Sequence, residues 1–244
     1  MEKTVWSRTL TGWATSYYTE LLWLVFALIA LTAGIKYYRK EKSNQLFIFY
    51  LFSSLLIINP IRSFISISLK LKGLNHTIYT EIINIFFGFV EISTFFYFFS
   101  KIFNTKKINH ILFTCWLIFL FVCVLFFLNS TKDTITKKQI IQNSYFVNSI
   151  EFLFLLSLCI LYFYLLLTKE TNKAIILTKS PSFWIISGLF FYCIVSLPFL
   201  LIGNSIFQDS HTLYFIIFSA HYISISILFL CIAKAFTCKV PLTT

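Results

Sequence analysis

Five ionisable side chains lie inside segments that are otherwise apolar, and these are the residues of the sequence that could do chemistry. They are Glu20, Arg62, Glu81, Glu91 and Glu151. An ionised group in the hydrocarbon of a bilayer is costly unless it is paired or faces water, so each of the five is a candidate functional residue. We expect Arg62 to be the cation of a buried site, with Glu81 and Glu151 as its counter-charges. Glu91 is predicted to lie near mid-membrane, where it must be protonated, paired or in contact with water.

Polar side chains recur at spacings of three and four around these charges, so each set shares one face of its helix. Four such stripes occur, in the segments that contain Arg62, Glu81, Glu151 and His221. We expect the stripes to converge on a cavity in the outer half of a helical bundle, where a small ligand or an ion would bind. The residues predicted to line this cavity are Asn59, Arg62, Ser63, Glu81, Asn84, Glu91, Asn148, Glu151, Tyr214 and His221.

Simpler interpretations compete with a ligand site. A pair between Arg62 and a glutamate can serve only to fix helix packing, and Glu20 and Glu81 can lie in the head-group layer. A single deep histidine such as His221 is more often a packing residue than a metal ligand, and neither a metal site nor a cofactor is predicted. Five of the six cysteines fall inside apolar segments, where we expect them to act as small packing residues.

The elements that must position these residues are helices in a membrane. Hydrophobic residues make up 58% of the 244 residues, and charged residues only 12%. Soluble domains carry about 25% charged residues, so the surplus apolar surface needs lipid as its solvent. The net charge of +11 comes from Lys and Arg placed between apolar segments, where they set orientation and meet anionic head groups. Nucleic acid is therefore not an expected partner, whereas the lipid bilayer is.

Seven apolar runs reach the length of roughly 20 residues that a helix needs to cross a bilayer. Because backbone groups in lipid must satisfy their own hydrogen bonds, the predicted fold is all-α, a polytopic bundle of seven transmembrane helices. Residues 1–18 are predicted to form an interfacial segment before the transmembrane domain 19–236, and 237–244 a short cytoplasmic tail. The predicted spans are 19–38, 45–68, 79–103, 110–128, 145–167, 182–203 and 212–236.

The distribution of Lys and Arg between the two sides predicts the orientation of the chain. With seven spans, one side holds twelve of these residues and the other side holds seven. The side with the excess is expected to be cytoplasmic, which places the N-terminus outside and the C-terminus inside.

Three short stretches resemble a known group of membrane proteins. They are Tyr79-Thr80-Glu81 before an aromatic third span, Ser180-Pro181-Ser182-Phe183-Trp184-Ile185-Ile186-Ser187-Gly188 at the start of the sixth, and Ala233-Lys234-Ala235-Phe236-Thr237-Cys238 at the end of the seventh. Together they look like uncharacterised seven-helix inner-membrane proteins of Bacteroidota. The resemblance implies a multi-pass protein of the bacterial inner (cytoplasmic) membrane, and it implies no particular activity.

The sequence favours a small ligand-responsive sensor or signalling component that acts through a cytoplasmic or membrane partner. The first alternative is a small-solute or ion-coupled transporter with Glu91 and His221 as proton or ion carriers. The second is an intramembrane enzyme that uses Glu91, Glu151 and His221. Catalysis is the less expected role, because no recognisable nucleophile or metal-ligand set accompanies these residues.

Overall fold

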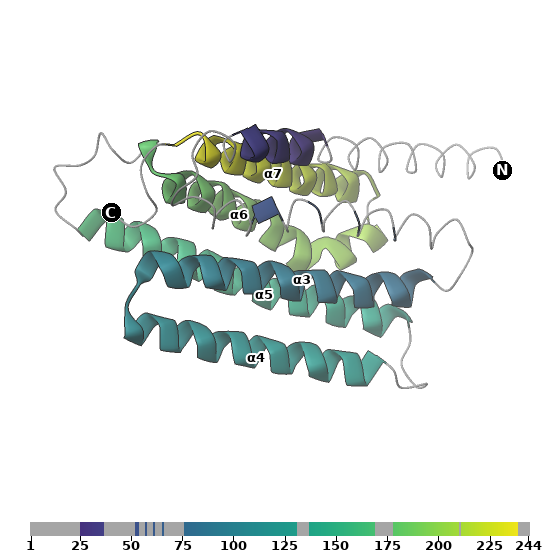
Figure 1. Ribbon diagram of the computed structural model, residues 1–244. Coiled ribbons are helices and arrows are strands. Elements are labelled where there is room, and N and C mark those ends of the chain that lie inside the picture. The colour runs from purple at the N-terminus through teal and green to yellow at the C-terminus, as the bar shows by residue number, and fades with distance from the viewer. Residues whose placement is uncertain are drawn as a thin grey trace.

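The described part of the chain is helical apart from short turns. The computed structural model describes residues 25–36, 76–130, 137–168, 178–209 and 211–238, together with the isolated helical positions 52, 53, 57, 61 and 65. No strand occurs in these residues, which agrees with the predicted all-α class. The helices are Val25–Lys36, α3 (His76–Phe103), α4 (Lys106–Ser130), α5 (Lys137–Thr168), α6 (Pro181–Asp209) and α7 (His211–Phe236), as Figure 1 shows.

Five of these helices, α3 to α7, are long and apolar enough to cross a membrane. The protein is therefore a multi-pass membrane protein. The predicted first span, 19–38, overlaps the shorter apolar helix Val25–Lys36. Nearly all of the predicted second span, 45–68, lies outside the described residues, as do the interfacial segment 1–18 and most of the tail 237–244. A total of seven spans thus stays a prediction, and so does the orientation of the termini.

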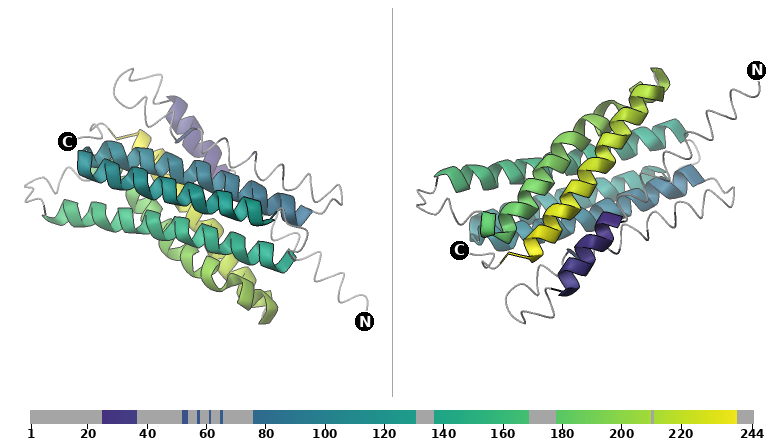
Figure 2. Two further views of the ribbon diagram at one scale, coloured as in Figure 1. Left: turned by 90° about the horizontal axis from the view of Figure 1, so that it is seen from below. Right: turned by 90° about the horizontal axis from the view of Figure 1, so that it is seen from above.

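The long helices form two groups that cross at an angle. Helices α3, α4 and α5 lie side by side, and α6 and α7 pack together as a pair across them (Figure 2). Helices α3, α5 and α7 run in one direction, and α4 and α6 run in the other (Figure 1). Only 17% of the α4 span is buried, against 50% of the α6 span, so α4 is the helix most exposed to lipid. The almost wholly apolar sequence of α4 predicts this position.

The turn between α3 and α4 depends on one asparagine. Asn104 has a φ of 44°, in the left-handed region that asparagine tolerates better than most residues. Its backbone N–H donates to the Ser100 carbonyl at 3.2 Å, which closes the last turn of α3. Helix α4 then starts within two residues, so the end of α3 and the start of α4 lie at the same end of the bundle.

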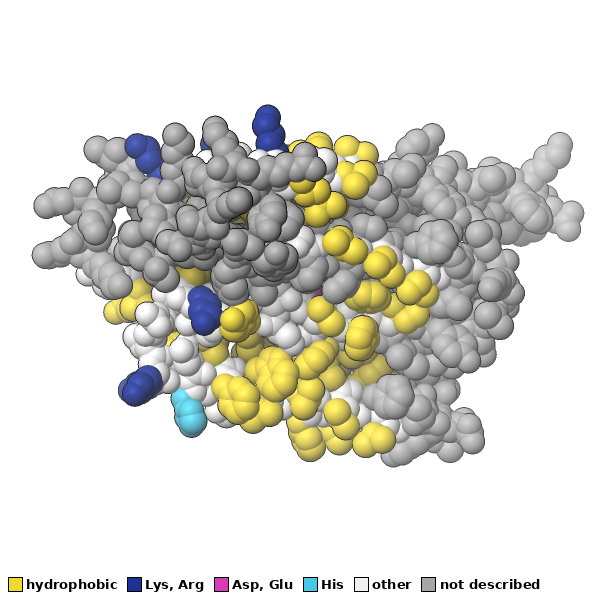
Figure 3. Space-filling model, in the orientation of Figure 1, with side chains coloured by type: hydrophobic (Ala, Val, Ile, Leu, Met, Phe, Trp, Pro, Cys, Tyr) yellow, Lys and Arg dark blue, Asp and Glu magenta, His cyan; other side chains and the backbone are white. Residues whose placement is uncertain are grey.

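Five described lysines lie at that end, which we call the lysine-rich end. Lys101 is in the last turn of α3, and Lys234 is in the last turn of α7. Lys106 and Lys107 begin α4, and Lys179 lies two residues before the first residue of α6. On the face shown in Figure 3, the Lys and Arg side chains lie over one half of the molecule, while hydrophobic side chains cover its middle.

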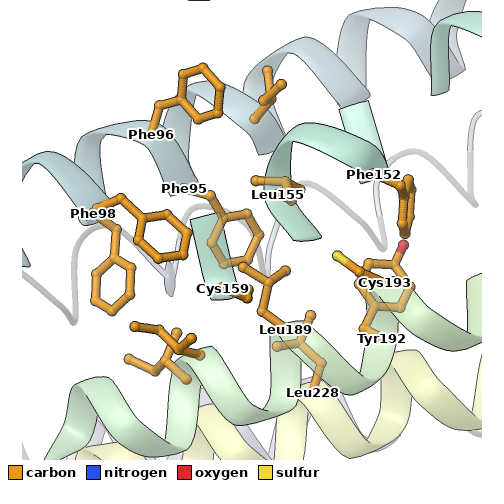
Figure 4. Close-up of a cluster of buried hydrophobic side chains, with 14 of the residues drawn as sticks. Phe95, Phe96, Phe98, Phe152, Leu155, Cys159, Leu189, Tyr192, Cys193 and Leu228 are labelled. Carbon is orange, nitrogen blue, oxygen red and sulfur yellow. The ribbon is translucent and has the colours of Figure 1, made fainter. Parts of the chain in front are cut away.

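Aromatic and aliphatic side chains fill the core between the middle of the bundle and the lysine-rich end. We call this region the dry layer, and Figure 4 shows part of it. Its rings pack edge to face, for example Phe52 against Phe98 at 5.3 Å between centroids. All of its members are at most 1% exposed: Phe52, Phe95, Phe98, Phe99, Leu155, Ile185, Ile186 and Leu189.

Candidate functional site

The side chain of Glu151 is buried inside the bundle, with only 2% of its surface exposed. It projects from α5 toward Gly88 of α3. A Cβ atom on residue 88 would lie 2.7 Å from Glu151 Oε2 and 3.7 Å from Asn148 Oδ1. Glycine therefore makes room at this position for a carboxylate and an amide from the neighbouring helix. The sequence placed Gly88 on the polar stripe of its segment without assigning this role.

Two further helices approach the same carboxylate. Glu91 lies one turn after Gly88 on α3, and both Glu91 and Glu151 are within electrostatic range of the Cys193 thiol on α6. Cys123 of α4 is also within electrostatic range of Glu151. We call Gly88, Glu91, Asn148, Glu151 and Cys193 the carboxylate cluster. It brings two of the predicted glutamates and one predicted asparagine from separate helices into one region.

His221 lies in a second polar group, between α6 and α7. Its Nδ1 atom and the Ser196 hydroxyl share a hydrogen bond of 2.7 Å. Aromatic rings surround the imidazole, with Phe199 stacked at 5.4 Å and Tyr192 at 5.7 Å between centroids. Tyr192 also packs against Phe152 at 4.9 Å. This series of ring contacts extends from His221 on α7 through Tyr192 on α6 to Phe152 on α5, the helix that carries Glu151.

Serine and histidine are residue types that can act as a nucleophile and its general base. The sequence did not reveal that Ser196 and His221 lie together. Ser196 has no exposed surface, however, and it lies in the interface between the two most closely associated helices, α6 and α7. A substrate would reach the hydroxyl only if these helices separated. We therefore assign the hydrogen bond to helix packing. The spacing of four between Gly188, Tyr192 and Ser196 is the signal that places this serine on the interface side of α6.

Among the remaining predicted site residues, the side chain of Asn84 is described and the others are not. Asn84 lies one turn before Gly88 on α3 and is half-buried. Glu81 and Tyr214 belong to α3 and α7, but the positions of their side chains lie outside the described part of the chain. Glu20, Asn59, Arg62 and Ser63 also lie outside the described residues. The predicted pairing of Arg62 with Glu81 and Glu151 therefore stays a prediction.

The dry layer lies directly against the carboxylate cluster on the side of the lysine-rich end. Phe95 follows Glu91 by one turn, and Leu155 follows Glu151 by one turn. On the antiparallel helix α6, Leu189 lies one turn from Cys193 in the same direction. All three are at most 1% exposed. Closer to the lysine-rich end, the Tyr162 hydroxyl lies 3.5 Å from the Ser182 hydroxyl, which lies 2.7 Å from the Ser180 hydroxyl.

The described side chains do not form a metal centre. Nowhere in the described ranges do three or more His, Cys, Asp or Glu side chains gather as a group that could ligate a metal ion. The Glu151 carboxylate and the Asn148 amide oxygen thus lie beside Gly88, and Cys193 interacts with the two carboxylates only electrostatically.

Comparisons with known proteins supply no relative for this chain. No family model matches the sequence, and neither the curated proteins nor the solved structures contain a significant match.

Proposed function

We propose that this multi-pass membrane protein is a small ligand-responsive sensor or signalling component, and that its response begins at the carboxylate cluster. The observation that carries the proposal is the burial of Glu151 against Gly88, with Asn148 beside it and Glu91 one turn away. Ionisable groups at membrane depth are rare and mark functional sites by default. A ligand that changes the charge balance here would change the contact between α3 and α5.

The dry layer favours a receptor over a transporter. A transporter needs a path that opens to both faces of the membrane, with polar side chains on either side of the central site. In the described residues, the cluster meets Phe95, Leu155 and Leu189 on the side of the lysine-rich end, and all three are fully packed. A solute that reached Glu151 would meet this layer within one helical turn.

The connections between the helices suggest how a response would leave the site. Helices α3 and α4 are joined by two residues, and α6 and α7 by one. Such short turns would couple a change in α3 to α4, and a change in α6 to α7, as a change in helix packing. The proposal therefore includes a separate cytoplasmic or membrane partner that receives this change.

The proposal is tested by thermal unfolding of the purified chain in detergent with a panel of small amines, carboxylates and alkali-metal salts. We expect at least one class of compound to raise the midpoint for the wild type and to lose that effect in Glu151→Gln. The matched control is Glu170→Gln, the same change in the segment after α5. A shift that survives in Glu151→Gln, or a panel without effect on the wild type, would overturn the proposal.

A flux measurement separates the sensor from the transporter. The protein is reconstituted into liposomes loaded with a pH-sensitive dye, and proton entry is followed after an external acid pulse. We expect proton entry into these liposomes to be as slow as into liposomes without protein. A faster rate that Glu91→Gln abolishes would establish proton-coupled transport in place of sensing.

A further inference from the structure

The five lysines of the lysine-rich end are exposed, and the described chain offers them no carboxylate. They are Lys101, Lys106, Lys107, Lys179 and Lys234. Among the described residues, none of these ammonium groups forms an ion pair, and Glu91 and Glu151 lie deeper in their helices. The undescribed segments 37–50 and 169–177 contain five basic residues, Arg39, Lys40, Lys42, Lys169 and Lys173, against two acidic ones, Glu41 and Glu170. By sequence, these two segments therefore carry more positive than negative charge.

Two of the lysines are held over aromatic rings at the ends of membrane spans. Lys101 Nζ lies 5.3 Å from the centroid of the Tyr97 ring, and Lys234 Nζ lies 6.0 Å from that of Trp184. Tyr and Trp are enriched where hydrocarbon meets the head groups. A lysine stem in such a position lies along apolar surface and lets its charge reach the head groups.

Trp184 also fixes the position of a third lysine. Its indole Nε1 donates to the Thr178 carbonyl at 2.7 Å. Thr178 immediately precedes Lys179, so the indole holds the turn that carries this lysine. Trp184 thus contacts both the Lys234 ammonium and the backbone next to Lys179, and within the described ranges neither lysine forms an ion pair.

We propose that the lysine-rich end is a binding surface for the phosphates of anionic phospholipids. Lys179 and Lys234 around Trp184 form one head-group position, and Lys101 with Lys106 and Lys107 across the α3–α4 turn forms a second. The charge is complementary to a phosphodiester, and the interfacial aromatic residues fix its depth. This inference does not depend on the carboxylate cluster, and it assigns a partner to the part of the molecule that the proposed sensing site does not use.

The experiment compares retention of phosphatidylglycerol and phosphatidylcholine by the purified full chain, using native mass spectrometry of protein taken from mixed vesicles. We expect phosphatidylglycerol to be retained in preference. Each lysine near an anionic surface favours binding enough that its loss lowers affinity about fivefold. Lys179→Gln with Lys234→Gln should therefore lower the preference about 25-fold. Lys234→Arg should retain it, because the charge is kept.

The control is Lys137→Gln with Lys138→Gln, the same change at the start of α5, which lies at the other end of the bundle from the lysine-rich end. Thermal unfolding in phosphatidylcholine alone checks that every variant is folded, which is expected for the lysine-rich end because Lys179 and Lys234 are exposed. Equal retention of the two lipids by the wild type, or an equal loss in the control, would overturn the proposal. So would displacement of the lipid by inorganic phosphate but not by chloride at matched ionic strength. Displacement by polyglutamate at that ionic strength would instead assign the surface to an acidic protein.

Discussion

The same three helices have two different interiors, separated by one turn. On one side of the boundary, α3, α5 and α6 contribute Glu91, Glu151 and Cys193 to the carboxylate cluster. On the other side they contribute Phe95, Leu155 and Leu189 to the dry layer, where the exposed surface is at most 1%. Close packing of the dry layer is suited to holding the helices together in lipid, where the hydrophobic effect does not drive their association. One bundle thus holds a closely packed region and a buried carboxylate at different depths, and under the proposed function the first would give stability and the second the response.

The largest effect should come from the dry layer. Phe98→Ala removes a fully buried ring that contacts Phe52 and Phe99, and we expect a loss of about 3 kcal/mol in the free energy of unfolding. The measurement is unfolding in mixed micelles by titration with a denaturing detergent. Phe121→Ala is the matched control, because Phe121 is 61% exposed on α4. If both variants lose the same amount, the dry layer is not the stabilising half.

A smaller loss is expected from Gly188→Ala at the contact between α6 and α7. A Cβ there would lie 2.7 Å from Cys231 Cβ and 3.3 Å from the Leu228 backbone, neither of which can move without moving the helix. We expect a loss of about 2 kcal/mol. The double variant with Cys231→Gly should recover part of the stability in the same titration. Failure to recover would mean that the crowding is not at Cys231.

Gly88→Ala tests the polar half with the same substitution. Here the nearest atom to the new Cβ is Glu151 Oε2, the far end of a flexible side chain. The displaced carboxylate is costly, but alanine favours the helix by about 1 kcal/mol, so we expect a net change within about 1 kcal/mol of zero. The ligand-dependent thermal shift should nevertheless be lost. A variant that is strongly destabilised would instead assign Gly88 and Glu151 to structural packing.

The smallest effect should come from the hydrogen bond between Ser196 and His221. Coupling energies of such bonds between transmembrane helices average about 0.6 kcal/mol, and we expect that value from a double-mutant cycle with Ser196→Ala and His221→Phe. Fluorophosphonate probes should not label Ser196 in the folded protein. Labelling that requires His221 would show an active nucleophile and return the enzyme alternative to first place.

Hydropathy and spacing predicted the helices better than their ends. The spans expected at 79–103 and 212–236 correspond closely to α3 and α7, whereas α5 begins at Lys137 instead of 145 and α6 continues to Asp209 instead of 203. Apolar runs mark only the part of a helix that lies in hydrocarbon, and polar residues extend the helix beyond it. The length of a span can therefore be predicted from its sequence, but the length of its helix cannot.

The stripes of polar residues were predictable, but their partners were not. Spacings of three and four predicted that Asn84, Gly88 and Glu91 share a face, as Asn148 and Glu151 do. Which stripe meets which depends on how each helix is rotated about its axis, and spacing along one helix carries no information on this rotation. For that reason the sequence did not show that Glu151 faces a glycine, or that Ser196 meets His221.

The close approach of Glu151 to Gly88 also has a consequence for evolution. A side chain at position 88 and a long carboxylate at position 151 compete for the same space, since the added Cβ would lie 2.7 Å from Oε2. Descendants of this gene that acquire alanine or serine at 88 should therefore shorten or lose the acid at 151. The two positions should vary together, although they are far apart in the chain.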